Sequence, residues 1–304
     1  MSISTAALRK PIWRQVQKKG SPYFLVAPAI LIILGVTIFP LIFSIGMSMT
    51  PLNLARPDSG GEFIGLRNYR DILLEFRFWK TLSNTLIMVS VAVTFEFFIG
   101  LLLAALVNRD FKGQRVITIL FLIPTLIVPV VIGMIWRLLL HESYGFINYI
   151  IRTLRIGKGV AWTAKPTLAL FVMTFIDIWE WTPLMFLILL AGMVSLPRDP
   201  FEAAAIEGAS SWQIFWRITF PLLQPVILVA ILIRLIDAFK LFDTIFVITA
   251  GGPGLATETT SMFVYYKAFK HFDIGIASSI SWIFLLIIIG ITTFLLKFLS
   301  RTEG

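Results

Sequence analysis

Ionisable side chains occur inside otherwise apolar stretches of this 304-residue chain. Asp177 and Glu180 lie in one such stretch, and Asp237 and Lys240 lie in another. A charged side chain at the centre of a bilayer costs about 2.5–3.5 kcal/mol, so each of these residues should face protein or water rather than lipid. Carboxylates in that position can accept hydrogen bonds from the hydroxyl groups of a solute.

Aromatic side chains accompany both groups of charges. Trp179 and Trp181 flank Glu180, and Phe239 precedes Lys240. Flat rings pack against the C–H surface of a polyhydroxylated solute, and an indole N–H adds a hydrogen-bond donor. We therefore predict a substrate path through the membrane, lined by Asp177, Trp179, Glu180, Trp181, Asp237, Phe239 and Lys240.

The charges could instead pair with one another. Asp237 with Lys240 and Asp177 with Arg234 are the expected ion pairs, while Glu96 stands alone near the middle of an earlier apolar stretch. Such pairs would hold helices together without contacting a solute. Both interpretations stay open at this point.

The composition places the chain in a bilayer. Hydrophobic residues make up 58% of it and charged residues only 14%, whereas soluble domains carry roughly 25% charged residues. The formal charge of +9 fits basic loops against anionic lipid better than it fits a nucleic-acid-binding surface. Zero cysteines exclude disulfides, thiolate metal sites and cysteine nucleophiles, and two histidines leave little for a metal centre. We predict no metal and no cofactor in this chain.

Six apolar stretches are long enough to cross a bilayer, which takes about 20 residues. The sequence therefore predicts an all-α, polytopic membrane domain over residues 23–300, preceded by a basic tail of residues 1–22. The apolar run after this tail is too long for the core of a signal peptide, so we expect an uncleaved anchor. The predicted spans are residues 23–49, 81–107, 115–140, 167–194, 218–249 and 274–298.

Several details of these segments can be predicted. Pro124 and Pro129 should bend the third span. Residues 68–82 have a helical spacing of apolar residues among charges, which predicts a helix in the membrane interface. On a continuous fifth span, Arg234 and Asp243 would point to opposite sides.

The loop between the fourth and fifth spans carries helix signals at close spacing. Pro197 should end the fourth span. Asp199 can then cap a short helix, with Pro200 at its first position and Glu202 where the acid of a capping box belongs. Gly208 can take the left-handed conformation that ends this helix.

A second short helix should follow the glycine. Ser210 or Ser211 can cap it, and Trp212, Phe215 and Trp216 would form its apolar face. The sequence thus predicts an elbow of two short helices on the membrane surface, suited to a soluble partner. An interfacial connector with no partner is the simpler alternative.

This elbow resembles a known signature. Glu202-Ala203-Ala204 followed by Gly208 is similar to the EAA…G motif of permease subunits in binding-protein-dependent ABC importers. Gly65-Leu-Arg-Asn-Tyr69 resembles a segment of the carbohydrate-uptake branch, typified by maltose and glycerol-3-phosphate importers. Gly251-Gly252-Pro253 resembles the segment that marks the first of two permeases. The resemblance covers residues 22–298.

The resemblance implies a type I ABC importer permease with six spans and both termini in the cytoplasm, on the inner membrane. Lysine and arginine counts alone favour that orientation only weakly. Residues 197–217 would form a cytoplasmic coupling loop seated in a groove of an ATPase subunit. The coupling residues would be Glu202, Ala203, Ala204, Gly208 and Trp212.

The implied partners are a second permease, two ATPase subunits and an extracytoplasmic solute-binding protein. A sugar would pass through the lipid bilayer by alternating access, and the chain itself would not be an enzyme. No Gly-x-x-x-x-Gly-Lys-Ser/Thr phosphate-binding loop occurs in the sequence. ATP and Mg²⁺ would therefore be bound by the partner ATPase.

Two other functions stay open. Arg234 and Lys240 would suit an anion, so the solute could be a sugar phosphate or a glycerol phosphodiester. An ion-coupled carrier using Glu96, Asp177 or Asp237 is the alternative from a different class. Six spans without an inverted repeat disfavour it.

Overall fold

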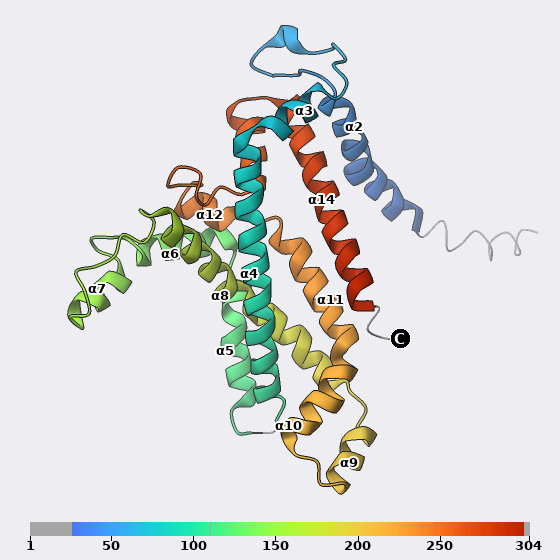
Figure 1. The fold of residues 1–304 in the computed structure, drawn as a ribbon, viewed down its shortest axis with the longest axis vertical. Helices are drawn as coiled ribbons and strands as arrows, with labels where there is room; N and C mark the ends of the chain where they lie inside the picture. The colour runs from blue at the N-terminus through green and yellow to red at the C-terminus, as the bar shows by residue number, and fades with distance from the viewer. Residues whose placement is uncertain (1–25, 110, 301–304) are drawn as a thin grey trace, which may run out of the picture.

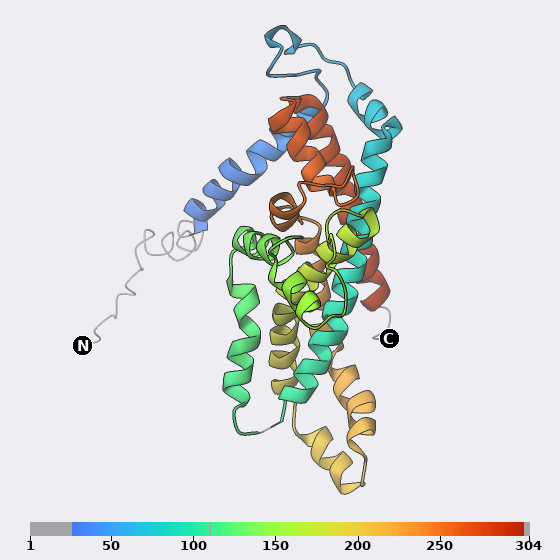
Figure 2. The same cartoon turned by 90° about the vertical axis from the view of Figure 1, so that its left-hand side faces the viewer.

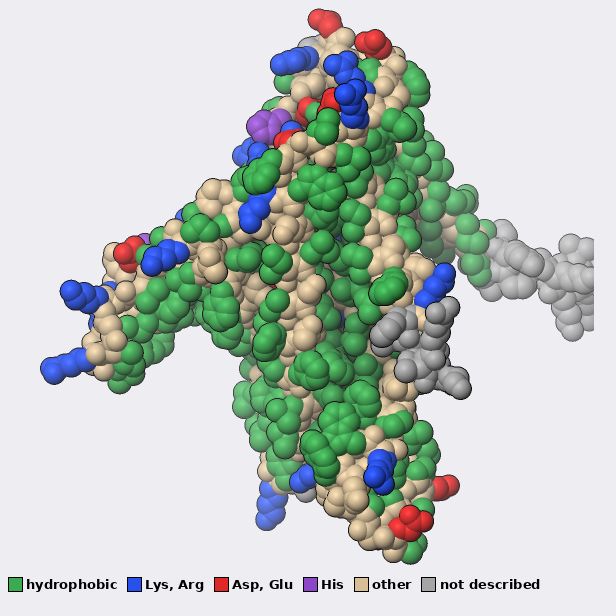
Figure 3. Space-filling view, viewed as in Figure 1, with side chains coloured by type: hydrophobic (Ala, Val, Ile, Leu, Met, Phe, Trp, Pro, Cys, Tyr) green, Lys and Arg blue, Asp and Glu red, His purple; other side chains and the backbone are tan. Residues whose placement is uncertain are grey.

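The fold is a bundle of long apolar helices with short helices at both ends, seen in a computed structural model that describes residues 26–109 and 111–300 (Figures 1 and 2). All regular structure in these ranges is helical. The predicted basic tail, residues 1–22, lies outside the described residues. Figure 3 shows hydrophobic side chains over the middle of one face and charged side chains at its two ends and on the projecting arm that carries α7, as expected for a chain that crosses a bilayer.

Five helical segments in the described ranges are long and apolar enough to span a membrane. They are Val26–Ser48, which contains η1 (Leu34–Ile38) and α2 (Phe39–Ser48); α4 (Phe76–Val107); α8 (Pro166–Val194); Ser211–Ile248, which contains α10 (Ser211–Ile214), η3 (Phe215–Thr219), α11 (Phe220–Ala238) and α12 (Asp243–Ile248); and α14 (Ile274–Ser300).

A bent pair supplies a sixth apolar segment, formed by α5 (Gln114–Leu126) and α6 (Pro129–Leu139). Shorter helices complete the fold: η2 (Pro57–Ser59), α3 (Arg67–Leu74), α7 (Phe146–Thr153), α9 (Asp199–Ile206), α13 (Thr260–Tyr265) and η4 (Tyr266–Lys270).

The centre of the bundle is formed by α4, α8 and α11. α4 packs along α8, and α11 packs against both. Glycines allow this close approach: a Cβ at Gly100 would lie 3.0 Å from the backbone nitrogen of Phe186, and one at Gly192 would lie 2.7 Å from Val226. Phe186, Leu189 and Leu223 are buried in the core between these helices.

The predicted bend of the third span is present at Pro129, whereas Pro124 lies inside α5 and not at the corner. α5 and α6 meet at 94°. Val128 has extended dihedral angles (φ −62°, ψ 132°), which is the conformation that a following proline favours, and Pro129 begins α6. α4 and α8 both run toward the end of the molecule that carries α9. The bent pair therefore takes the chain from that end, where α4 stops, back toward the start of α8 (Figure 1).

The fifth span is not the continuous helix of residues 218–249 that the sequence suggested. The helical segment starts at Ser211, and α11 ends at Ala238 before α12 begins at Asp243. α12 packs on α6, where Gly133 leaves room for Val247. The expectation that Arg234 and Asp243 share one helix, and so point to opposite sides of it, was therefore wrong.

The interfacial helix predicted over residues 68–82 is also divided. α3 ends at Leu74, Glu75 is extended (φ −78°, ψ 117°), and α4 begins at Phe76. The Glu75 carboxylate lies 3.3 Å from Lys267 Nζ. This long-range contact, which local periodicity cannot reveal, accompanies the break in the helix.

The first span lies largely outside the bundle. None of the most apolar window of Val26–Ser48 is buried. This segment contacts α14 mainly through the C-terminal end of α2, where Trp282 Nε1 donates to Ser44 Oγ (Figures 1 and 2). Asn68 in the Gly65–Tyr69 segment fixes the same corner, because its side-chain amide donates to the carbonyls of Ser48 and Thr50.

The end of the molecule opposite α9 is held by a strap. Its residues are Arg77 and Asn84 on α4 and the loop of residues 249–259 that contains the Gly251-Gly252-Pro253 segment. Arg77 makes hydrogen bonds to both carboxylate oxygens of Glu258, the shortest of 2.7 Å. Asn84 Nδ2 donates to the carbonyls of Leu255 and Glu258. The loop is thereby attached to α4.

Candidate functional site

A single guanidinium joins the three central helices. Arg234 on α11 donates from Nε to Glu96 on α4 at 2.6 Å, and from Nη2 to Glu96 at 2.9 Å and to Asp177 on α8 at 2.5 Å. All three side chains are almost fully buried. Burying a charge in this way is tolerable only because each group is paired and hydrogen-bonded.

A more exposed pair lies beside this cluster. Lys240 Nζ is 2.8 Å from Asp237 Oδ1, and Arg234 Nη1 is 3.7 Å from the other carboxylate oxygen of Asp237. The predicted pairs Asp177–Arg234 and Asp237–Lys240 are confirmed. Glu96 was expected to stand alone and does not, because α4 and α11 approach closely enough for a bidentate pair with Arg234.

Asp177, Arg234, Asp237 and Lys240, but not Glu96, line a cavity of about 320 Å³, which is named here the charged cavity. Asp177 Oδ1 is buried and has no hydrogen-bond partner in the described structure. Glu180 Oε2 is 3.5 Å from the Thr244 hydroxyl, and the Arg234 guanidinium lies 5.2 Å from the Trp181 ring centroid. The walls are formed by Pro129, Asp177, Glu180, Trp181, Arg234, Asp237, Ala238, Lys240, Leu241, Phe242, Asp243 and Thr244.

Five of the seven residues predicted for a substrate path line this cavity, namely Asp177, Glu180, Trp181, Asp237 and Lys240. Trp179 does not; it packs edge-on against Trp136 of α6, because two residues along a helix turn a side chain by about 200°. Phe239 does not either; its side chain is only 1% exposed and it packs against Phe284 of α14.

Sequence reasoning missed other members of the cavity wall. Phe242 lies in the break between α11 and α12, Thr244 lies at the start of α12, and Pro129 comes from the bend of the third span. No local pattern signals that these breaks meet. Arg234 was recognised as a charge, but its central place depends on the packing of three helices. Among the described residues, no group of three or more His, Cys, Asp and Glu side chains is placed to hold a metal ion.

The elbow between α8 and α11 is the second candidate site. Gly208 ends α9 in the left-handed conformation (φ 76°), as predicted. The amide of the following residue, Ala209, donates to the Ala204 carbonyl at 3.0 Å. Ser210 caps α10 through a capping box with Gln213, which confirms the predicted second cap.

Other expectations for the elbow were wrong. α9 starts at Asp199 itself and has Arg198 at the N-cap position, so Asp199 lies inside the first turn and makes no capping hydrogen bond. Glu202 forms no capping box and is exposed. α10 is not a separate helix, because it continues through η3 into α11.

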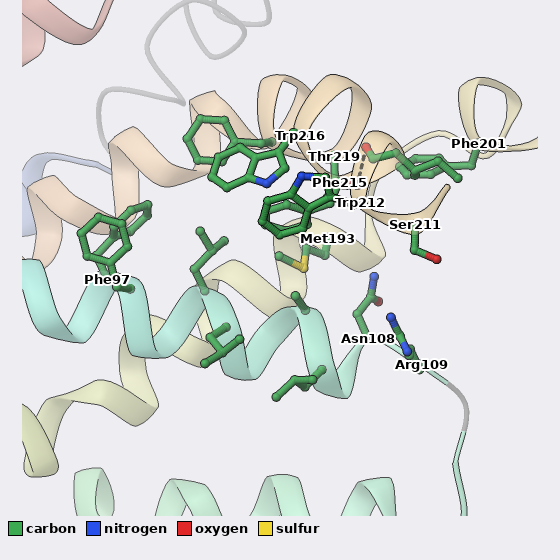
Figure 4. Close-up of a pocket in the computed structure, with 17 residues that line it drawn as sticks. Phe97, Asn108, Arg109, Met193, Phe201, Ser211, Trp212, Phe215, Trp216 and Thr219 are labelled. Atoms are coloured by element: carbon green, nitrogen blue, oxygen red, sulfur yellow. Dashed lines mark hydrogen bonds between the residues drawn. The ribbon is translucent and has the colours of Figure 1, made fainter. Parts of the chain in front are cut away.

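The aromatic face of the elbow turns toward α4. Trp212 and Phe215 each contact Trp216 at ring-centroid distances of 5.5 and 5.2 Å. In Figure 4 these rings and Phe201 border a groove of about 840 Å³, with Asn108 and Arg109 at the end of α4 on its far wall. The exposed residues of α9 are Asp199, Glu202, Ala203, Ala205 and Ile206. Ile206 is 88% exposed and was not singled out from sequence.

Comparisons with known proteins match most of the chain. Residues 96–301 match the family described as binding-protein-dependent transport system inner membrane component. A probable ABC transporter permease protein of Sinorhizobium fredii is 41% identical over 275 residues, which cover 90% of this chain and 87% of the relative. The trehalose/maltose transport system permease protein of Thermococcus litoralis is 36% identical over 275 residues, covering 90% and 92%.

A solved structure shares the fold. In the crystal structure of a bacterial alginate ABC transporter, in complex with an alginate-bound periplasmic protein, one chain superposes with a TM-score of 0.81. The two sequences are 20% identical, and the match covers 94% of this chain and 96% of the other. At that identity the likeness concerns the fold.

Proposed function

This chain belongs to the family of binding-protein-dependent transport system inner membrane components, and from that premise we propose which of its parts carry solute and which respond to ATP hydrolysis. It is a permease subunit of a carbohydrate ABC importer and not an enzyme, since the ATPase of this family is a separate subunit.

The charged cavity would form this chain's half of the sugar path, and the second permease would supply the other half. The observation that carries this proposal is Asp177, which lines the charged cavity beside α8 and α11 and whose buried Oδ1 has no hydrogen-bond partner. Buried polar atoms are nearly always hydrogen-bonded, and an unpaired one is costly. A sugar hydroxyl would satisfy this oxygen, with Glu180 and Asp237 as further acceptors and Trp181 as an apolar face.

The elbow is the proposed coupling loop. Glu202, Ala203, Gly208 and Trp212 are exposed, while Ala204 is buried and anchors α9. An ATPase groove would grip the exposed face, and closure of two ATPase subunits around ATP would pull on α9. Because α10, η3 and α11 form one helical segment, that pull would reach the charged cavity directly. The remaining partner is an extracytoplasmic solute-binding protein that delivers the sugar.

The proposed orientation places the elbow and both termini in the cytoplasm. In this orientation ATP and Mg²⁺ stay with the ATPase subunits, and this chain contributes no cofactor site. Its own contribution is to accept the solute when the cavity opens outward and to release it when the elbow moves, which is alternating access.

Single cysteines test the orientation and the coupling role, because the natural chain has none. Ile206→Cys on α9 should be labelled by a membrane-impermeant maleimide only from the cytoplasmic side. Leu66→Cys, which is also exposed but lies just before α3 at the opposite end of the molecule, should be labelled only from outside. Crosslinking from residue 206 should capture the ATPase subunit. Labelling of residue 206 from outside, or capture of lipid alone, would overturn the proposal.

Reconstitution tests the energy source. Proteoliposomes that contain both permeases and the ATPase should take up sugar only when ATP and the binding protein are supplied. Uptake by this chain alone, driven by an ion gradient, would favour a secondary carrier instead.

A further inference from the structure

The groove of about 840 Å³ between α4 and the elbow, called here the elbow groove, has apolar walls on both sides. On α4, Phe98, Leu102 and Leu106 are spaced four residues apart and so share one face, and they are 55–61% exposed. Trp212 and Trp216 belong to the opposite wall and are 71% and 45% exposed. Contiguous apolar surface of this kind marks a site for an apolar ligand or for lipid.

One end of the elbow groove is polar. In Figure 4, Phe97 lies at one end, and Asn108, Arg109 and Ser211 lie at the other. Arg109 is the one charged residue among the described residues of the wall, it is exposed, and none of the ion pairs among described residues includes it. A guanidinium, an amide and a hydroxyl group at this end can donate hydrogen bonds to an anion.

The length of the elbow groove matches one leaflet of a bilayer. From Phe97 to Asn108, α4 advances by about 16 Å at ~1.5 Å per residue. One leaflet contributes about 15 Å to a hydrocarbon core of about 30 Å. If Arg109 lies at the level of the lipid headgroups, the apolar walls reach as deep as an acyl chain does. Trp212 then lies near the interface, where tryptophan is enriched.

We propose that the elbow groove binds an anionic phospholipid of the cytoplasmic leaflet. One acyl chain lies along Leu102 and Trp216, and the phosphate accepts hydrogen bonds from Arg109, Asn108 and Ser211. The proposal takes only the identity of the leaflet from the proposed orientation. The lipid fills the space between α4 and the helical segment that leads from the elbow toward the charged cavity, so it supports the elbow against the bundle.

Photolabelling of the assembled importer tests this. The complex of both permeases and the ATPase is placed in nanodiscs of phosphatidylcholine that contain a small fraction of a probe with a diazirine in one acyl chain. The probe is either phosphatidylglycerol or phosphatidylcholine, with identical chains. Mass spectrometry should find adducts on residues 97–106 and 212–220. The yield there should be about fivefold higher for phosphatidylglycerol, which is the contribution of one arginine near an anionic headgroup.

Two variants connect the adducts to the elbow groove. Arg109→Gln should lower the yield of the phosphatidylglycerol probe about fivefold and leave that of phosphatidylcholine unchanged. Arg115→Gln is the matched control, because Arg115 is an exposed arginine at the start of α5 that does not line the groove. Leu102→Trp narrows the groove and should lower the yield of both probes. Val116→Trp, at an exposed position of α5 outside the groove, should not.

A photoreactive amino acid at residue 102 identifies the occupant directly, and we expect it to capture phospholipid. Capture of the second permease there would show that protein fills the elbow groove and would overturn the proposal. Equal yields from the two probes, or an unchanged yield in Arg109→Gln, would overturn it as well.

ATP-driven sugar uptake by the same complexes separates this proposal from the coupling role of the elbow. Normal uptake without selective labelling of the elbow groove leaves the coupling role in place and removes the lipid site. Selective labelling in a complex that hydrolyses ATP but takes up no sugar leaves the lipid site in place and counts against the coupling role.

Discussion

At the scale of single residues, one buried arginine makes ion pairs with carboxylates on two other helices. Arg234 is 2% exposed and donates hydrogen bonds to Glu96 and Asp177, which lie on different helices. Asp237 and Lys240 lie at the rim of this cluster and are more exposed. Buried and rim charges should therefore respond differently to substitution.

Arg234→Met should strongly destabilise the importer. The substitution leaves two buried carboxylates without their counterion, and breaking a buried pair in this way costs about 3–5 kcal/mol. The apparent Tm of the purified complex should fall, and less complex should be recovered from membranes. Lys240→Met is the control, since the Lys240 side chain is 69% exposed; a comparable loss in both variants would contradict a structural role for the buried cluster.

Asp237→Asn should affect transport more than assembly. Arg234 keeps its contacts to Glu96 and Asp177, so the cluster survives, while the charged cavity loses an acceptor at its rim. The KM for sugar uptake in proteoliposomes should rise with little change in the yield or Tm of the complex. Loss of the whole complex would show instead that Asp237 is mainly a structural ion-pair partner.

At the scale of helices, the positions of the apolar spans could be predicted from the sequence, whereas several of the breaks between helices could not. The apolar spans could be read from the sequence because a run of about 20 apolar residues is a long signal, and the caps at Gly208 and Ser210 because they depend on residues a few positions apart. The breaks at Glu75 and after Ala238 could not, because their contacts come from distant residues: Lys267 pairs with Glu75, and Thr259 and Ser261 donate to the carbonyls of Leu241 and Phe239.

The candidate sites divide in the same way. The two short helices of the elbow, the turn at Gly208 and the cap at Ser210 were predicted correctly because their signals are local, whereas the cap at Asp199 was not. The charged cavity was predicted from the types of Asp177, Glu180 and Asp237, whereas the exclusion of Phe239 depends on its packing against α14. Which face of a span meets water is a property of the neighbouring helices and not of the span.

The turn at Gly208 gives a prediction with an internal control. Its φ is 76°, and a Cβ there would meet nothing within 4 Å, so only the backbone conformation restricts the residue. Gly208→Asn should retain most ATP-driven uptake, because asparagine tolerates the left-handed region. Gly208→Val should lose it, since the strain of about 1–2 kcal/mol is relieved by rearranging the elbow. Equal uptake by the two variants would show that the turn is not what coupling requires.

At the scale of the whole molecule, contacts between segments far apart in the sequence hold the end opposite α9 together. The strap attaches the loop of residues 249–259 to α4 through Arg77, Asn84 and Glu258. The Glu258 side chain is 2% exposed, and Arg77 is its ion-pair partner at 2.7 Å. The break after α11 and this loop are thus fixed relative to α4.

Arg77→Ala should loosen the strap. It leaves the Glu258 carboxylate buried and unpaired, at a cost of about 1–3 kcal/mol, so the loop of residues 249–259 should become accessible to protease in right-side-out vesicles and the apparent Tm should fall. Arg67→Ala is the matched control, because its pair with Asp71 is exposed and 3.9 Å long and should contribute less than about 0.5 kcal/mol. Equal protease resistance of the natural chain and Arg77→Ala would count against the strap.

In the proposed alternating-access cycle, the shared guanidinium of Arg234 limits how the central helices can move. Drawing any two of α4, α8 and α11 apart would strand a charge in a medium that cannot solvate it. These three helices must therefore travel together as one body throughout the cycle. The movement would then occur at the existing breaks in the helices, the 94° corner of the third span and the gap between α11 and α12. Restricting either break, for example by a crosslink, should stop transport without changing the packing of α4, α8 and α11.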